Sequence, residues 1–375
     1  MTVYGFTNGH LVTPTGVLSA ATLTVENRTL RQITEGAGAG ATDLDGGWIM
    51  PGFVDTQVNG GGGVLFNDAP TVEGIAAIGA AHRRFGTTAF LPTLISDTPD
   101  AIARALDAMD AAIVAGVPGV VGAHIEGPVL SPARKGIHDP ARLRPLDDAL
   151  LELLVRPRRG RVMVTLAPER VSAARIHALV QAGVVVSLGH SDATLAEAKA
   201  GFAAGITGVT HLFNAMSPLL HRAPGVVGAA LDDQEVYCGL IVDGVHVDNA
   251  ALRVALRARP LDRFMLVTDA MPSVGADLTE FRLDGRPIRV QDGRCVGADG
   301  TLAGCHLDMA TAVRRTIIDL GITPARAAAM AATNPAAFLG LDATHGSLTV
   351  GRRADWVRLD AAFQPIETVV GGEPA

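Results

Sequence analysis

The amino-acid sequence predicts an α/β protein, namely a (β/α)₈ TIM barrel with a small β-sandwich domain formed from both chain termini. Three observations predict this fold. Eight short apolar runs alternate with helical patterns along the middle of the chain, strand-like segments occupy both ends, and four polar residues stand where apolar runs stop. Short apolar runs are typical of buried parallel strands, and this many β/α alternations favour a closed barrel over an open sheet.

Both ends of the chain carry strand patterns separated by Gly, Asn and Pro. The expected strands are Phe6–Thr13, Ala20–Val25, Leu30–Ile33, Gly346–Val350, Asp355–Leu359 and Ile366–Val370. Because chain ends often lie close together, we expect residues 1–49 and 345–375 to form one small domain and residues 50–344 to form the barrel.

The barrel elements follow from the apolar runs and the helix caps. The predicted barrel strands are Trp48–Val58, Thr87–Leu94, Val120–Glu126, Arg161–Ala167, Val184–His190, Gly208–Phe213, Tyr237–Val242 and Phe264–Asp269. Helices are predicted at Val72–Phe85 (with Thr71 as N-cap), Pro99–Val114, Ala173–Ala182, Leu195–Ala204, Met309–Leu320 and Pro324–Phe338. We expect Ala215–Glu235 to be more loop than helix, and Phe281–Ala303 to be a β-hairpin inserted after the eighth strand.

The composition argues against several classes of partner. A net charge of −7 and a pI of about 5.9 disfavour nucleic-acid binding, which needs a basic face. No apolar run approaches the roughly 18–20 residues of a membrane helix, and the first residues lack the pattern of a secretory signal. Three cysteines without C-x-x-C spacing fit a reducing compartment. A cytoplasmic protein without membrane or nucleic-acid partners is therefore expected.

Four polar residues end separate predicted strands: Glu126, His190, His211 and Asp269. The carboxyl ends of barrel strands are where barrel enzymes place their chemistry. A catalytic divalent ion takes about three protein ligands and keeps one open position, which Glu126, His190 and His211 would supply. Such an ion lowers the pKa of a water towards about 7, and Asp269 would act as general base and then general acid. This pattern predicts hydrolysis of an amide or a similar C–N bond.

Each of these residues also has a plainer interpretation when taken alone. Each His fits a hydrogen-bonded structural role, Glu126 a salt bridge at the barrel mouth, and Asp269 a cap on a following helix. Their shared topological position favours the catalytic interpretation over these.

Several ordered motifs resemble the amidohydrolase superfamily and, within it, the N-acetylglucosamine-6-phosphate deacetylase family. The motifs are PGFVDTQVNGGGGVLFND (51–68), HIEGPV (124–129), KGIHDP (135–140), SLGHSDA (187–193), THLFNAM (210–216), IVDGVHV (241–247), VTDA (267–270) and NP (334–335). The resemblance covers almost the whole chain. It implies hydrolysis of N-acetyl-D-glucosamine 6-phosphate to D-glucosamine 6-phosphate and acetate.

One departure from the wider superfamily concerns the metal. Many members carry His-x-His at the end of the first barrel strand and bind a second ion there, whereas this chain has Gln57 and Asn59. Amide side chains are poor ligands for a second transition metal. We therefore expect one divalent metal per subunit, with zinc or iron favoured over cobalt or manganese, and Gln57 and Asn59 in structural or supporting positions.

The resemblance also implies the substrate contacts. His138 and His246 match sugar-contacting residues, Asn214 and the backbone of Ala215 match phosphate contacts, and Arg222 matches an Arg that reaches into the neighbouring subunit's site. A homodimer binding an amino-sugar phosphate is thus implied. From the residues alone, Arg222 fits a solvated loop charge better, and His138 and His246 fit surface loop positions equally well.

Two further features and two rival functions remain open. The glycine run Gly60–Gly63 lacks phosphate-loop spacing and fits a loop that passes close to the site. The segment Thr301–Cys305 (TLAGC) resembles a family segment that lines the acetyl pocket, where Ser is usual at the position of Cys305. Cys305 is a small filler or an adventitious metal ligand, with filler favoured. The rivals are the same chemistry on another N-acyl substrate, such as N-acetylgalactosamine 6-phosphate or an N-acyl-D-amino acid, and a non-catalytic sugar-phosphate sensor.

Overall fold

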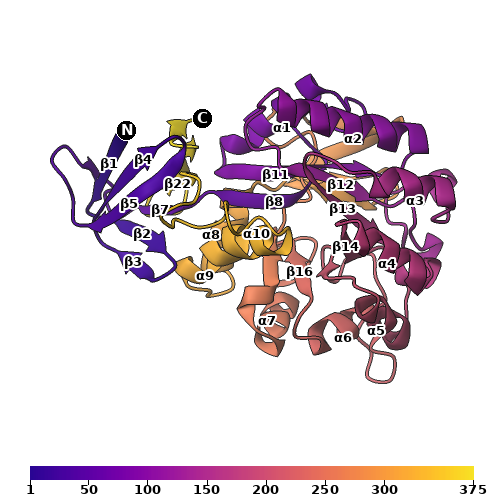
Figure 1. Ribbon diagram of the computed structural model, residues 1–375. Coiled ribbons are helices and arrows are strands. Elements are labelled where there is room, and N and C mark those ends of the chain that lie inside the picture. Colours follow the sequence, from indigo (N-terminus) through magenta and orange to yellow (C-terminus); the bar gives the residue numbers. More distant parts are fainter.

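The computed structural model describes residues 1–375, and an eight-stranded parallel sheet forms its centre (Figure 1). The strands follow one another around the sheet in chain order, and every neighbouring pair is parallel. They are β8 (Phe53–Val58), β11 (Thr87–Ile95), β12 (Gly122–Glu126), β13 (Arg161–Leu166), β14 (Val185–Leu188), β15 (Gly208–Val209), β16 (Tyr237–Leu240) and β17 (Phe264–Leu266).

The first and last strands of this sheet approach each other and nearly close the barrel. Val58 at the end of β8 pairs in parallel with Ala270 beyond β17, and the Asp269 amide donates to the Gln57 carbonyl at 3.0 Å. The predicted TIM barrel is therefore confirmed. The regular strands are shorter than predicted at β14, β15 and β17, because the polar residues that follow them leave the extended conformation.

Helices lie around the outside of the barrel between successive strands (Figure 1). Their bounds are α1 (Val72–Arg83), α2 (Pro99–Val114), α3 (Asp148–Val155), α4 (Ala173–Gln181), α5 (Leu195–Ala203), α6 (Gly225–Asp232), α7 (Asn249–Ala258), α8 (Met309–Ile318), α9 (Pro324–Ala328) and α10 (Asn334–Phe338). A π-helical turn (Ala329–Thr333) joins α9 to α10. The hydroxyl of Thr71 caps α1 through the Gly74 amide, as predicted. None of the helices is both long enough and apolar enough to cross a bilayer.

The segment Ala215–Glu235 is more loop than helix, as expected, but its second half contains a helix that was not predicted, α6. All but one of the eight residues of α6 are buried, and its run Gly225–Leu231 has no polar face. A helix that is apolar on every side lacks the amphipathic period from which helices are recognised in a sequence, so only its packing reveals it. Helices α3 and α7 were not predicted at all.

The insertion after the barrel is a four-stranded antiparallel sheet, not the single hairpin expected. Its strands are β18 (Glu280–Leu283), β19 (Arg286–Gln291), β20 (Arg294–Val296) and β21 (Leu302–Cys305). Two Asp-Gly pairs, Asp284–Gly285 and Asp292–Gly293, make the first two turns with positive φ at both residues. This is the backbone of a two-residue hairpin turn, so each pair adds one strand reversal.

The terminal segments together form two sheets at one end of the barrel, and both chain ends lie there (Figure 1). One sheet contains β1 (Thr2–Thr7), β4 (Ala21–Glu26), β5 (Thr29–Glu35) and β6 (Thr42–Asp43); the other contains β2 (His10–Thr13), β3 (Gly16–Leu18), β7 (Trp48–Pro51), β22 (Trp356–Leu359), β23 (Pro365–Val370) and β24 (Glu373–Pro374). A separate apolar cluster of 12 buried residues, including Trp356, fills the space between them. The exact limits of the two domains stay a prediction.

The predicted strand Trp48–Val58 divides between these two parts of the molecule. Its first half, β7, pairs with β2 and β22 in the terminal sheet, and its second half, β8, opens the barrel. A Cβ on Gly52, which lies between them, would meet Thr88 atoms at 2.2–2.8 Å. A glycine is therefore required where the chain passes from one sheet to the other.

Candidate active site

Four side chains from separate strand ends point into the carboxyl-terminal mouth of the barrel. Glu126 is the last residue of β12, and His190 and His211 each follow their strands (β14 and β15) by two residues. Asp269 follows β17 by three residues. His190, His211 and Asp269 have φ values of 47°, 32° and 50°, which lie in the left-handed region. This turn ends each strand and leaves its polar side chain at the mouth, so the four predicted residues do share one site.

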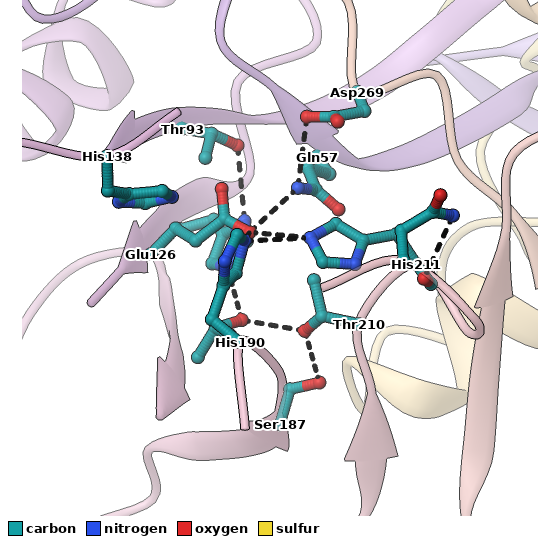
Figure 2. Close-up of polar contacts among 12 residues, drawn as sticks. Gln57, Thr93, Glu126, His138, Ser187, His190, Thr210, His211 and Asp269 are labelled. Carbon is teal, nitrogen blue, oxygen red and sulfur yellow. Dashed lines mark hydrogen bonds and ion pairs between the residues drawn. The ribbon is translucent and has the colours of Figure 1, made fainter. Parts of the chain in front are cut away.

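Glu126, His190 and His211 converge on one point (Figure 2). The Nε2 atom of His211 lies 3.1 Å from Glu126 Oε1 and 3.1 Å from His190 Nε2, and His190 Nε2 lies 3.3 Å from Glu126 Oε1. Their side chains are only 3–7% exposed. Donor atoms held about 2.0–2.1 Å from a tetrahedral ion lie roughly 3.3 Å from one another, so this triangle fits a divalent cation.

The protonation of the histidines supports the same conclusion. Nδ1 of His190 lies 2.9 Å from the Arg134 carbonyl and must donate to it, which leaves a lone pair on Nε2. Burial alone would raise the pKa of Glu126, but positive charge and donated hydrogen bonds at His190 and His211 outweigh burial and hold that pKa well below its usual range; a cation supplies the same positive charge when the rings are neutral. Two imidazole nitrogens and an ionised carboxylate so close together form an electron-rich cluster that a cation stabilises.

His138 lies beside this cluster and could be considered a fourth ligand, since its ring is 4.5 Å from that of His190. Its hydrogen bonds favour another role. The backbone N–H of Ser96 donates to His138 Nδ1 at 3.3 Å, so the ring carries its proton on Nε2. Burial and the neighbouring His190 lower the pKa of His138 to about 3, and the ring is therefore neutral. His138 is a hydrogen-bond donor at the edge of the cavity.

Asp269 faces the cluster across the mouth and is held by two amides. Asn59 Nδ2 donates to Asp269 Oδ1 at 2.7 Å. Gln57 Nε2 donates to the same oxygen at 3.1 Å (Figure 2). Gln57 Nε2 also lies 3.1 Å from Glu126 Oε1 and so links the two carboxylates. Burial and the charge of Glu126 raise the pKa of Asp269 to about 6, which makes it a better proton acceptor than an ordinary Asp.

These groups open onto a cavity of about 360 Å³, within the size range of small-molecule sites. Of the residues predicted to contact substrate, His138, Asn214, Ala215 and His246 line it. Arg222 does not: its side chain is exposed and borders a separate surface pocket with Leu220 and Asp192. Within one chain, therefore, four of the five predicted substrate contacts come together.

The cavity wall also includes Thr301, Leu302, Ala303 and Gly304, as the resemblance of the TLAGC segment to a family segment lining the acetyl pocket implies. Sequence reasoning did not assign Met271, which also lines the cavity, or the role of Asp243. Asp243 holds His246 through a 2.6 Å contact between Oδ2 and Nδ1. The Asp was visible in the motif IVDGVHV, but nothing local indicates that the inserted sheet folds back over the barrel mouth.

Comparison with known proteins assigns the family. The model of the amidohydrolase family matches residues 48–375. The chain belongs to the amidohydrolase family. Among curated members, it is 43% identical to an N-acetylgalactosamine-6-phosphate deacetylase from Shewanella sp. (strain ANA-3), covering 88% of this chain and 84% of the relative. It is 36% identical to an N-acetylglucosamine-6-phosphate deacetylase from Haemophilus influenzae, covering 88% and 87%.

Solved structures agree with this membership. N-acetylglucosamine-6-phosphate deacetylase from Pasteurella multocida superposes with a TM-score of 0.95 at 33% identity, covering all of both chains. A mutant of the Mycobacterium smegmatis enzyme in complex with N-acetyl-D-glucosamine-6-phosphate has a TM-score of 0.91 at 33% identity, covering 100% of this chain and 99% of that one. This amidohydrolase therefore shares its whole architecture with deacetylases of phosphorylated amino sugars.

Proposed function

We propose that this amidohydrolase hydrolyses the N-acetyl group of N-acetyl-D-glucosamine 6-phosphate, producing D-glucosamine 6-phosphate and acetate. The convergence of Glu126, His190 and His211 opposite Asp269, in one cavity, carries this proposal. The deacetylases that resemble the chain over most of its length support the choice of substrate. A sugar-phosphate sensor would need neither a general base nor an open metal position.

Glu126, His190 and His211 would hold a single divalent ion, with zinc or iron favoured over cobalt or manganese. When bound, such an ion lowers the pKa of a water and polarises the acetyl carbonyl. Gln57 and Asn59 donate their amide hydrogens to Asp269, and Gln57 donates to Glu126 as well. Both amides thus hydrogen-bond to carboxylates around the ion, which favours a role in positioning those carboxylates over a role as metal ligands.

We expect one tightly held ion per chain, because no second set of imidazoles stands at Gln57 and Asn59. Elemental analysis after exhaustive dialysis measures this directly. A stoichiometry of two retained ions would contradict the single-ion assignment.

Asp269 would act first as general base and then as general acid. It would take the proton from the attacking water and deliver it to the leaving amine. Both transfers require a single carboxylate that faces the water and the amine nitrogen. The hydrogen bonds from Gln57 and Asn59 hold its Oδ1 in place, leaving Oδ2 free to exchange the proton.

The substrate would be recognised at its sugar and its phosphate. His138 would donate from Nε2 to the sugar, and His246, oriented by Asp243, would contact sugar and phosphate. Asn214 and the backbone of Ala215 would contribute further phosphate contacts from the cavity wall. Arg222 would serve a neighbouring subunit of a homodimer, which agrees with its exposure outside its own chain's cavity; a guanidinium offers a planar fork to phosphate oxygens.

A second candidate substrate is N-acetyl-D-galactosamine 6-phosphate, which the 43% identical relative favours. The two sugars differ in one hydroxyl configuration, so the chemistry and the metal site are common to both.

We further propose a reducing cytoplasmic location, which the three unpaired cysteines Cys238, Cys295 and Cys305 support.

Acetate release tests the proposal. We expect metal-stripped protein to be inactive on N-acetyl-D-glucosamine 6-phosphate and metal-restored protein to release acetate. Comparing kcat/KM across this sugar, its galactose epimer and an N-acyl-D-amino acid then ranks the substrates. Binding of the sugar phosphate without acetate release by the restored protein would favour the sensor instead.

A further inference from the structure

A second group of metal-ligating side chains lies at the same cavity, apart from Glu126, His190 and His211. Asp243 and His246 follow β16, and Cys305 is the last residue of β21. One ligand atom from each lies within 4.8 Å of the other two. The proposed hydrolysis uses only His246 of the three, as a substrate contact, and leaves the thiol without a role.

The spacing within this group is close to that of ligands around one ion. Cys305 Sγ lies 3.5 Å from His246 Nδ1, and Nδ1 lies 2.6 Å from Asp243 Oδ2. Sulfur and nitrogen ligands at about 2.3 and 2.05 Å from a tetrahedral zinc ion lie roughly 3.5 Å apart. The contact between His246 Nδ1 and Asp243 Oδ2 has to open to roughly 3.3 Å, and all three ligand atoms already lie within 4.8 Å of one another.

Two independent elements hold the group in place. Asp243 Oδ1 accepts from the backbone amides of Val245 and His246 at 2.8 and 2.9 Å, which fixes the loop after β16. Cys305 is anchored to the barrel by its amide, which donates to the Asp269 carbonyl, and by its carbonyl, which accepts from Met271, both at 2.9 Å. The side chains of Asp243 and His246 are each 7% exposed, and Cys305 is 1% exposed.

The surroundings favour a cation over a free thiolate. Burial raises the pKa of the Cys305 thiol well above its usual value, and the nearby carboxylates of Asp269 and Asp243 raise it further. The negative field that opposes a thiolate attracts a positive ion, whose charge then compensates the thiolate and both carboxylates.

We propose that Asp243, His246 and Cys305 form a second cation site, selective for thiophilic divalent ions such as zinc or cadmium. Occupation forms bonds from the ion to Cys305 Sγ, His246 Nδ1 and Asp243 Oδ2 and releases the thiol proton to solvent, while the imidazole proton moves from Nδ1 to Nε2. Releasing the proton of a thiol whose pKa is raised weakens this site relative to the Glu126, His190 and His211 site, so it fills when free ion is added and empties on dialysis.

An ion bound there takes His246 away from the substrate. Excess zinc or cadmium would therefore inhibit by competing with the sugar phosphate. Ion binding itself is independent of the proposed function, whereas this inhibition rests on it.

Cobalt titration of the dialysed holoenzyme tests the site. A thiolate bound to Co²⁺ produces a near-ultraviolet charge-transfer band, which the sulfur-free principal site cannot give. We expect the wild type to take up one more ion than the variant Cys305→Ser and to show the band, which the variant lacks. The matched control is Cys295→Ser, a buried thiol on the adjacent strand β20, which should retain both the extra ion and the band.

Equal stoichiometry and absorption in wild type and Cys305→Ser would overturn the site. The variant Asp243→Asn keeps the thiol and gives a second measurement if Cys305→Ser folds poorly; we expect it to weaken the extra Co²⁺ at least tenfold, and unchanged affinity counts against the proposal.

Inhibition kinetics test the effect of the ion on substrate binding. Cadmium should compete with the sugar phosphate in the wild type but not in Cys305→Ser. Thiolate-dependent ion binding without competition would confirm the site and contradict the assignment of His246 to the substrate.

Discussion

Three of the four side chains at the barrel mouth project from residues with a left-handed backbone: His190, His211 and Asp269. Asp and His are among the few non-glycine residues enriched in this region, and such conformations cost on the order of 1–3 kcal/mol. Parallel ladders on both sides hold β14 and β15, and a ladder with β16 holds β17. The positive φ ends each strand abruptly and leaves its polar side chain inside the mouth.

Asp269→Asn should keep the metal and lose turnover, because the amide cannot accept the proton of the attacking water. General acid–base groups contribute about 10²–10⁴-fold in rate, so we expect kcat to fall by that factor while metal content stays at the wild-type value. The control is Asp277→Asn, an exposed carboxylate in the following loop. Near-normal kcat in Asp269→Asn would remove this residue from the mechanism.

Arg222→Ala should weaken phosphate recognition without affecting the chemical step. We expect KM for the phosphorylated sugar to rise at least tenfold and kcat for the unphosphorylated sugar to stay unchanged, since the guanidinium would pair only with phosphate. Steady-state kinetics on both sugars measure this, with the exposed Arg257→Ala on α7 as control. Equal increases in KM for both sugars would exclude a phosphate contact.

At the scale of elements, a chain of hydrogen bonds lies beneath the site and joins neighbouring strands (Figure 2). Thr93 on β11 contacts His124 on β12 at 3.2 Å, and His124 contacts Thr165 on β13 at 2.7 Å. The hydroxyls of Thr165 and Ser187 each lie 2.7 Å from that of Thr210, which follows β15. This chain connects five strands under the metal ligands, so their relative positions depend on it.

Thr165→Val should destabilise the barrel by removing the middle of this chain. The substitution leaves the buried Nε2 of His124 without a partner, at a cost of about 1–3 kcal/mol, and removes one of the two hydroxyl contacts of Thr210. Urea denaturation measures the change in the free energy of unfolding. Thr279→Val, at an exposed position, is the control, and an equally small effect at both positions would contradict a structural role for the chain.

At the scale of the whole molecule, buried histidines link stability to pH. His82 on α1 is fully buried, with Nε2 2.9 Å from the Gly60 carbonyl, and burial lowers its pKa in the folded state. Burial also lowers the pKa of His345, which lies between the barrel and the terminal sheets. The unfolded chain, with His pKa values near 6.5, then binds more protons than the folded one in mildly acidic solution, so stability falls there.

His82→Gln should reduce this pH dependence, because the amide can still donate to Gly60 but cannot ionise. The stability that neutral His82 contributes is fully present above pH 6.5 and is lost as pH falls through its lowered folded pKa. We expect urea midpoints at pH 8 and pH 5 to differ less in His82→Gln than in the wild type. The control variant His177→Gln, at an exposed position, should show the wild-type difference in midpoint. If that difference is unchanged in His82→Gln, His82 is not a source of the pH dependence of stability.

Much of the barrel and the principal cluster was predictable because each of their signals is local. An apolar run that stops at His190 or Asp269 reports both a buried strand and the polar group at its tip. Helix α6 was missed because a helix buried on every side has no polar period. The inserted sheet was predicted as a single hairpin because its two Asp-Gly pairs were not recognised as two separate strand reversals. The role of His138 could not be decided from the sequence, since it depends on which nitrogen meets the distant Ser96 amide.

The sequence by itself determined the order of the barrel strands, most of the helices that carry an amphipathic pattern, the family, and which polar residues end the strands, because these depend on neighbours a few positions apart. Only the tertiary structure decided that Glu126, His190 and His211 meet within 3.3 Å and that Gln57 links Glu126 to Asp269. It alone brought Cys305 against His246, 59 positions away. Such contacts arise from barrel closure and from the return of the inserted sheet over the mouth, and no local pattern of residues encodes a distance across the fold.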